Sequence, residues 1–436
     1  MLIISIIYLF ILFISKIIIN LNLIIGNLII IILLLNLFNL SWIDWIYIFC
    51  NLRFNIYSYG LIILTLWIFG LIFISLNNNR LNCLFINLLL IISLLLVFLS
   101  INLLLFYLFY EFGLLLIFYL VVKWGYSENR WLSGFYLIFY TIIFSLPILY
   151  IIYYIYLIDY RLNFILIEIL NLNLNIVLFI YLLISFLVKI PIYLFHGWLL
   201  KAHVEAPYYG SIILASIILK LGGYGILRLI IIYKNEFILI QKILVIINSF
   251  GVLILRLICL SQFDIKSIIA ISSIVHIGLI IIRIITFFKI RLIGGYLIMI
   301  SHGLSSSGLF FLVNVIYRQT NRRLIFINKG IINFIPSISL LWFILCSSNI
   351  GSPVSLNLIS EVILLIGIIS WLKFIILILI IYCLFRFIYS IYLFIFINHG
   401  KIFIMFKIKN GILVEYFVLL LHWIPLNLIF LKLYFI

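Results

Sequence analysis

The stretch IVLFIYLLISFLVKIPIYLFHGWLLKAHVEAP, residues 176–207, carries the features that decide the fold. Residues 176–195 are mostly apolar and have about the length that a helix needs to cross a bilayer of about 30 Å. Lys189, Ile190 and Pro191 lie inside this run. A proline inside a helix removes a backbone hydrogen bond and clashes with the preceding turn. The segment therefore predicts a membrane-spanning helix, near residues 175–195, that is broken or bent at the proline.

The rest of the chain is as apolar as this segment. Of its 436 residues, 68% are hydrophobic and 8% are charged, and the mean hydropathy is +1.47. About a quarter of the residues of a soluble domain are charged, so the excess apolar surface must face lipid. Only helices and closed barrels satisfy every backbone amide in hydrocarbon, and barrel strands alternate polar and apolar residues. Unbroken apolar runs of about 20 residues therefore predict an all-α polytopic membrane protein.

Splitting the chain at polar residues, glycines and prolines predicts about fourteen transmembrane helices. They are placed near residues 2–19, 23–40, 59–76, 83–100, 103–122, 132–157, 175–195, 209–233, 239–259, 266–287, 293–317, 331–366, 371–397 and 412–434.

The twelfth span contains a second interruption, at Gly351, Ser352 and Pro353. Interrupted helices five spans apart are expected when a transporter consists of two related halves that meet near the bilayer midplane. We therefore predict two inverted five-helix repeats with broken helices 7 and 12. The predicted divisions are 1–82 (helices 1–3), 83–233 (first antiporter-like repeat, helices 4–8), 234–398 (second repeat, helices 9–13) and 399–436 (helix 14).

The net charge of +17 does not indicate a nucleic-acid partner. The lysines and arginines stand singly or in small groups between apolar runs, as topology-setting loop charges do, and form no stripe that could follow a phosphate backbone. The expected partner of this surface is membrane lipid.

A few ionisable residues fall inside the predicted spans, where a charge costs at least about 2.5–3.5 kcal/mol. Glu111 lies deep in the fifth span and Lys189 directly before the first proline break. The two can neutralise one another, either as a structural ion pair that fixes helix register or as a pair whose separation frees a proton. Lys220, near the middle of the eighth span, suggests a proton carrier or a lysine bound to unwound backbone.

Three more titratable residues extend this row. Glu361 follows the break in the twelfth span, while His276 and His302 lie in the tenth and eleventh spans. Imidazole passes protons near neutral pH, although single histidines also serve as packing residues.

The loop HGWLLKAHVEAP supplies His196, His203 and Glu205. Their spacing matches no standard zinc pattern, and the five cysteines are scattered without a CxxC pair. A loop-structuring or supporting relay role is expected, with no metal. The sequence also lacks Walker and dinucleotide motifs, which indicates no cofactor site.

These residues resemble the antiporter-like subunit 4 family of mitochondrial NADH:ubiquinone oxidoreductase, respiratory complex I. The resemblance is carried by the segment from Lys189 to Pro207 and by Leu219-Lys220-Leu221-Gly222-Gly223-Tyr224-Gly225, and it covers roughly residues 100–365. It implies a proton path formed by the pair Glu111 and Lys189, the central carrier Lys220, the bridging His276 and His302 and the terminal carrier Glu361. It also implies that FMN, iron–sulfur clusters, NADH and ubiquinone belong to other subunits, and that the antiporter-like subunits 2 and 5 are neighbours.

Residue usage leans to Ile, Leu, Phe, Asn, Tyr and Lys, whose codons are mostly rich in A and T, which indicates an organellar gene. The expected location is the mitochondrial inner membrane, with the gene in the mitochondrial genome; the amino-terminal run, which lacks a transit peptide, agrees with this. Two other functions remain open from the sequence. The chain could belong to a cation/proton antiporter, or be a passive membrane scaffold whose buried charges only hold helices together.

Overall fold

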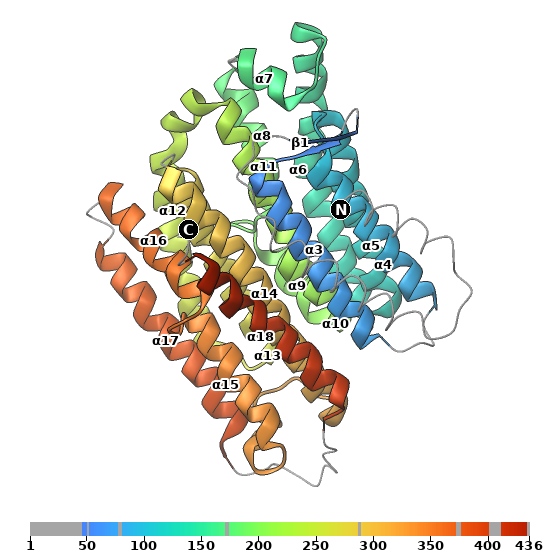
Figure 1. Ribbon diagram of the computed structural model, residues 1–436, viewed down its shortest axis with the longest axis vertical. Helices are drawn as coiled ribbons and strands as arrows, with labels where there is room; N and C mark the ends of the chain where they lie inside the picture. The colour runs from blue at the N-terminus through green and yellow to red at the C-terminus, as the bar shows by residue number, and fades with distance from the viewer. Residues whose placement is uncertain are drawn as a thin grey trace. The chain divides into compact units, whose positions relative to one another are not determined.

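A computed structural model describes residues 46–49, 52–76, 81–170, 174–286, 289–371, 376–400 and 411–433 (Figure 1). Nearly all of them are helical. The exception is a short antiparallel pair formed by β1 (Ile46–Phe49) and β2 (Leu52–Phe54), in which Ile46 pairs with Phe54 and Tyr47 with Arg53. The predicted all-α class is confirmed, and this pair is an addition to it.

The helices follow one another with short connections. Their bounds are α3 (Ile56–Ser75), α4 (Leu81–Leu99), α5 (Leu103–Trp124), α6 (Arg130–Asp159), α7 (Phe164–Leu170), α8 (Ile176–Lys189), α9 (Gly197–Glu205), α10 (Tyr208–Ile213), the π-helix η1 (Leu214–Ile218), α11 (Leu219–Ile232), α12 (Lys234–Ser261), α13 (Ile265–Ile284), α14 (Lys289–Thr320), the 3₁₀ turn η2 (Ile331–Asn333), α15 (Pro336–Ile350), α16 (Leu356–Trp371), α17 (Ile376–Asn398) and α18 (Leu413–Leu433).

Within the described ranges, ten helical segments are long and apolar enough to cross a membrane, and α8, α15 and α16 are shorter apolar helices. Together they account for the third to fourteenth predicted spans. The first two predicted spans, near 2–19 and 23–40, lie outside the described residues. The short helix α7 was not predicted, because its seven residues are too few to cross a membrane and lie between the predicted spans 132–157 and 175–195.

Both predicted helix breaks are confirmed. Helix α8 ends at Lys189, before Pro191, and the chain becomes helical again only at Gly197. Helix α15 ends at Ile350 and is followed by Gly351, whose φ of 90° lies in the left-handed region that glycine tolerates best. At each break backbone polar groups lose their partners within the helix, which in a membrane is tolerated only inside protein or beside water.

The chain forms two compact units that interleave along the sequence. The first comprises residues up to 189, 205–213 and 224–236, and the second comprises 190–204, 214–223 and 237 onward. The repeat boundaries predicted at 82, 233 and 398 stay a prediction.

In the first unit, α4 packs on α3 and α5, and α6 on α5 and α8. In the second unit, α14 is the central helix, because it contacts η1, α13, α15, α16 and α18. The neighbouring helix α13 is buried over its whole length. By contrast, α12 and α17 present large apolar side chains outward, among them Leu239 and Leu377. In a membrane protein such apolar faces contact lipid or neighbouring subunits, whereas polar and ionisable side chains lie on helices inside the bundle.

Candidate functional site

Glu111 and Lys189 meet inside the first unit. Lys189 Nζ lies 2.6 Å from Oε1 of Glu111, and the lysine side chain is almost fully buried while that of Glu111 is 17% exposed. The ammonium also lies 3.0 Å from the centroid of the Tyr110 ring. Glu111 projects from the middle of α5, and the proline break places Lys189 at the carboxyl end of α8, where a cation also interacts favourably with the helix dipole. The predicted pair is therefore present.

Lys220 occupies the first turn of α11 in the second unit, directly after η1. Its Nζ donates to the carbonyl of Ala215, five residues earlier and inside the π-helix, at 2.5 Å. A π-turn interrupts the regular backbone hydrogen bonds from residue i to residue i−4. Here the Ala215 carbonyl accepts a hydrogen bond from the Lys220 side chain. The same Nζ lies 3.0 Å from Nδ1 of His302 on α14. The backbone contact expected from the sequence is present, and the role of Lys220 as a proton carrier stays a prediction.

The row continues through His276 and Glu361. The rings of His302 and His276, on α14 and α13, have centroids 5.4 Å apart. His276 Nδ1 then lies 3.6 Å from Oε1 of Glu361 on α16. Four titratable side chains from four helices thus form one row inside the second unit, and all but the partly buried Glu361 are at most 3% exposed.

The loop residues lie apart from these contacts. The His196 ring stacks on Tyr193 and its Nδ1 contacts the Tyr193 carbonyl. His203 is fully buried and stacks on Phe310, with ring centroids 4.8 Å apart. This places both imidazoles in local packing; their supporting role in a relay stays a prediction.

Glu205 ties down the loop that follows α5. One carboxylate oxygen accepts from the Ser127 hydroxyl at 2.6 Å and from the Ser127 backbone N–H at 3.3 Å. The Glu205 carbonyl also accepts from the Tyr126 backbone N–H. These contacts are those of a loop-structuring residue.

Sequence reasoning missed the arginines of the second unit. Arg386 on α17 pairs with Glu361 and donates to the Asn349 carbonyl. Arg283 on α13 donates to the Ser360 carbonyl at 3.2 Å. The sequence did contain a signal for Arg386, namely a charged residue inside a predicted span. Arg386 lies within the span 371–397, just as Glu111 lies within the span 103–122.

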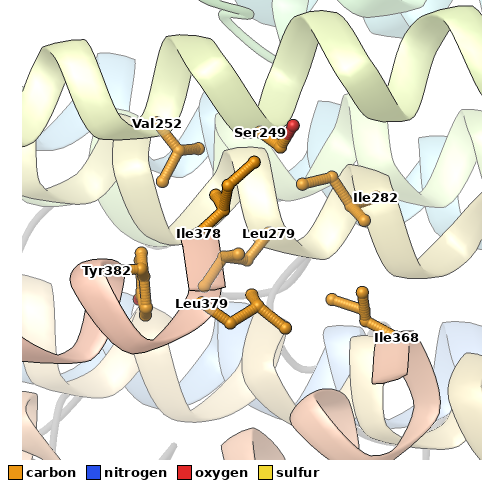
Figure 2. Close-up of a pocket in the computed structure, with 8 residues that line it drawn as sticks. All are labelled: Ser249, Val252, Leu279, Ile282, Ile368, Ile378, Leu379 and Tyr382. Carbon is orange, nitrogen blue, oxygen red and sulfur yellow. The ribbon is translucent and has the colours of Figure 1, made fainter. Parts of the chain in front are cut away.

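A small apolar pocket of about 10 Å³ lies between α12, α13, α16 and α17 (Figure 2). Among its lining residues, only Ser249 and Tyr382 bring side-chain hydroxyls, and Leu279 and Ile368 are typical of the rest. Cavities of this composition stay dry. The titratable row is not part of its wall.

Comparison with known proteins places these features in a family. Residues 100–387 match the model of the NADH:quinone oxidoreductase/Mrp antiporter membrane family. The NADH-ubiquinone oxidoreductase chain 4 of Apis mellifera ligustica is 86% identical over 417 residues, covering 96% of this chain and 93% of the relative. The chain 4 of Ceratitis capitata is 42% identical and covers 87% and 86%.

Solved structures agree on the fold. A chain of respiratory complex I from Thermus thermophilus matches with a TM-score of 0.82 at 20% identity, covering 94% of this chain and 93% of that one. A chain of the archaeal membrane-bound sulfane sulfur reductase matches with a TM-score of 0.85 at 18% identity, covering 98% and 92%. With its interrupted helices, its buried titratable row and these relatives, the chain belongs to the NADH:quinone oxidoreductase/Mrp antiporter membrane family, and within it to the NADH-ubiquinone oxidoreductase chain 4 proteins.

Proposed function

We propose that the chain is a proton-translocating membrane-arm subunit of respiratory complex I, which couples NADH oxidation and ubiquinone reduction elsewhere in the complex to proton pumping. The observation that carries the proposal is the arrangement of buried titratable groups. Glu111 and Lys189 form a close pair in the first unit, and Lys220 begins a row in the second that ends at Glu361. Repeated burial of ionisable groups is costly in a membrane and marks proton relays.

The chemistry of the first unit is that of a separable ion pair. While Glu111 and Lys189 touch, each neutralises the other. Once they separate, burial disfavours the ammonium of Lys189, and its proton is released to a neighbouring acceptor. A lysine suits this role because burial readily changes its protonation.

The chemistry of the second unit is stepwise transfer. Lys220 is within hydrogen-bond distance of His302, so a proton on its ammonium can pass to the imidazole. Imidazole accepts a proton on one nitrogen and donates from the other, which carries the charge toward His276 and Glu361. The wider steps, 5.4 Å between the rings and 3.6 Å to the carboxylate, are completed by a bridging water or a small side-chain movement.

The chain acts as part of an enzyme rather than as one alone. In this proposal it holds no redox centre, substrate site or metal, and FMN, the iron–sulfur clusters, NADH and ubiquinone are bound by other subunits. Its neighbours are other complex I subunits, specifically the antiporter-like subunits 2 and 5, together with membrane lipids. It resides in the mitochondrial inner membrane and is encoded in the mitochondrial genome.

Two alternatives are less well supported. A subunit of a cation/proton antiporter has the same fold, as the match to a chain of the Mrp complex of Dietzia illustrates with a TM-score of 0.81, but that match has only 15% identity and covers 47% of that chain. The 86% identity to a chain 4 protein favours complex I. A passive scaffold would not need a row of titratable groups at van der Waals or hydrogen-bond spacing, since each one adds a burial cost.

The deciding experiment measures protons pumped per NADH oxidised by the assembled complex in sealed vesicles. We expect Glu111→Gln or Lys220→Ala to reduce this ratio. The matched control is Lys123→Ala, which removes an exposed lysine from the same helix as Glu111. An unchanged ratio in assembled Glu111 and Lys220 variants would overturn the proposal.

A further inference from the structure

A single buried side chain joins both sides of the break between α15 and α16. Arg386 on α17 is 3% exposed. Its Nε donates to the carbonyl of Asn349 at 3.0 Å, and its Nη2 donates to the same oxygen. Its Nη1 pairs with Oε2 of Glu361. Because Asn349 lies in the last turn of α15 and Glu361 in the second turn of α16, the guanidinium braces the carboxylate against the end of the preceding helix.

The local backbone explains why an arginine occupies this position. The last carbonyls of a helix lack partners within it. The Gly351 N–H donates to the backbone carbonyls of Ser347 and Ser348, and the Asn357 side-chain amide donates to the Ser348 carbonyl at 2.7 Å. The Asn349 carbonyl is satisfied by Arg386. A planar guanidinium presents several donors at fixed angles and can serve this carbonyl and a carboxylate at once, whereas an ammonium is a point charge.

The Glu361 carboxylate therefore has two different sides. Oε2 is bound by Arg386, while Oε1 faces Nδ1 of His276 at 3.6 Å. The backbone beside it is also fixed, because Arg283, on the same helix as His276, donates to the Ser360 carbonyl. Arg386 and Arg283 thus fix the position of the Glu361 carboxylate and leave its Oε1 facing His276.

We infer that Arg386 is a positioning residue that keeps Glu361 deprotonated between transfers, with Oε1 turned to His276, and that Glu361 takes up its proton through that oxygen. The inference rests on the proposed function and deepens it. Arginine keeps its charge in proteins, whereas lysine can lose its proton. The pair of Lys189 with Glu111 and the pair of Arg386 with Glu361 therefore differ, since Lys189 can pass a proton on and Arg386 cannot. In the second of these pairs only the carboxylate changes its charge.

This inference is tested without turnover, by the protonation of Glu361. Dicyclohexylcarbodiimide reacts with protonated carboxyl groups in apolar surroundings, and mass spectrometry of the peptides gives the modified fraction at each carboxyl. In the detergent-solubilised complex at neutral pH, we expect Arg386→Gln to raise modification of Glu361 by about tenfold or more, because loss of a buried counter-ion favours the protonated form of the carboxyl. Modification of Glu111, whose partner is untouched, should not change in the same sample. An equal rate at Glu361 with and without Arg386 would overturn the inference.

A second variant covers the case in which Arg386→Gln does not assemble. Arg386→Lys keeps the positive charge but lacks the planar guanidinium with its several donors. We expect the modified fraction of Glu361 to lie between those of the wild-type complex and the glutamine variant, and fewer protons to be pumped per NADH. The control Arg228→Lys alters another buried arginine, one that binds Tyr224 of its own helix, and should leave Glu361 modification unchanged. Wild-type values for both readouts in Arg386→Lys would contradict a positioning role. Failure of the proposed function appears separately, as normal pumping by Glu111 and Lys220 variants.

Discussion

Lys189 and Glu111 stand 78 positions apart in the sequence, yet their charged groups are 2.6 Å apart. The break after α8 places the lysine at a helix end, and the middle of α5 supplies the acid. A pair that is both buried and close can hold the helices together and can exchange a proton, and mutation can separate these two roles.

The first prediction concerns this pair. Glu111→Gln or Lys189→Met alone leaves a buried charge without its partner, which costs about 3–5 kcal/mol. We expect each single variant to lower the thermal inactivation midpoint of the complex and the protons pumped per NADH. The double variant should regain most of the stability but not the pumping. Recovery of pumping in the double variant would mean that the pair is only structural.

The second prediction concerns the link between Lys220 and the second half of the row. His302→Met keeps a side chain of similar length but removes the ring nitrogen 3.0 Å from Lys220 Nζ. We expect the proton-to-electron ratio to fall with little loss of assembly. His399→Gln, at an exposed imidazole beyond the end of α17, is the control and should leave the ratio unchanged. Equal ratios in the two variants would exclude His302 from the path.

The third prediction concerns the end of α15. Gly351 has φ of 90°, where a Cβ costs about 1–2 kcal/mol. Gly351→Ala should therefore lower the thermal midpoint of the complex and displace the Arg386 and Glu361 contacts beside it. Gly197→Ala is the matched control, because a Cβ at Gly197 would meet nothing within 4 Å. If the two substitutions have the same effect on stability, the left-handed cap is not important.

The fourth prediction separates anchoring from transport at Glu205. Ser127 donates two hydrogen bonds to this carboxylate, and losing such a bond costs about 1–3 kcal/mol. Glu205→Ala should reduce the stability of the complex while the proton-to-electron ratio stays normal. Ser127→Ala should have a smaller effect that does not add to it, because the hydroxyl bond that it removes is one of the bonds that Glu205→Ala also removes. A reduced ratio in stable Glu205→Ala complex would instead support a relay role.

The sequence predicted the helices well because long apolar runs and proline or glycine breaks are local signals. Pro191 and Gly351 each mark a real break. The titratable row was also predictable in its members, since Lys220 and Glu361 are conspicuous in apolar surroundings. The partners of these residues were harder to predict, because no local sequence pattern indicates that Arg386 on α17 pairs with Glu361 on α16. The π-helix before Lys220 gave no signal at all, since an extra residue in one turn leaves the apolar pattern intact.

That extra residue has a mechanical consequence. An α-helix turns by about 100° per residue, so if Leu214–Ile218 tightened to ordinary α-helical pitch, everything that follows would rotate about the axis by an angle of that order. The Lys220 ammonium would swing off His302 and lose the Ala215 carbonyl. Winding or unwinding this one turn would thus make or break the contact between Lys220 and the other titratable groups of the row.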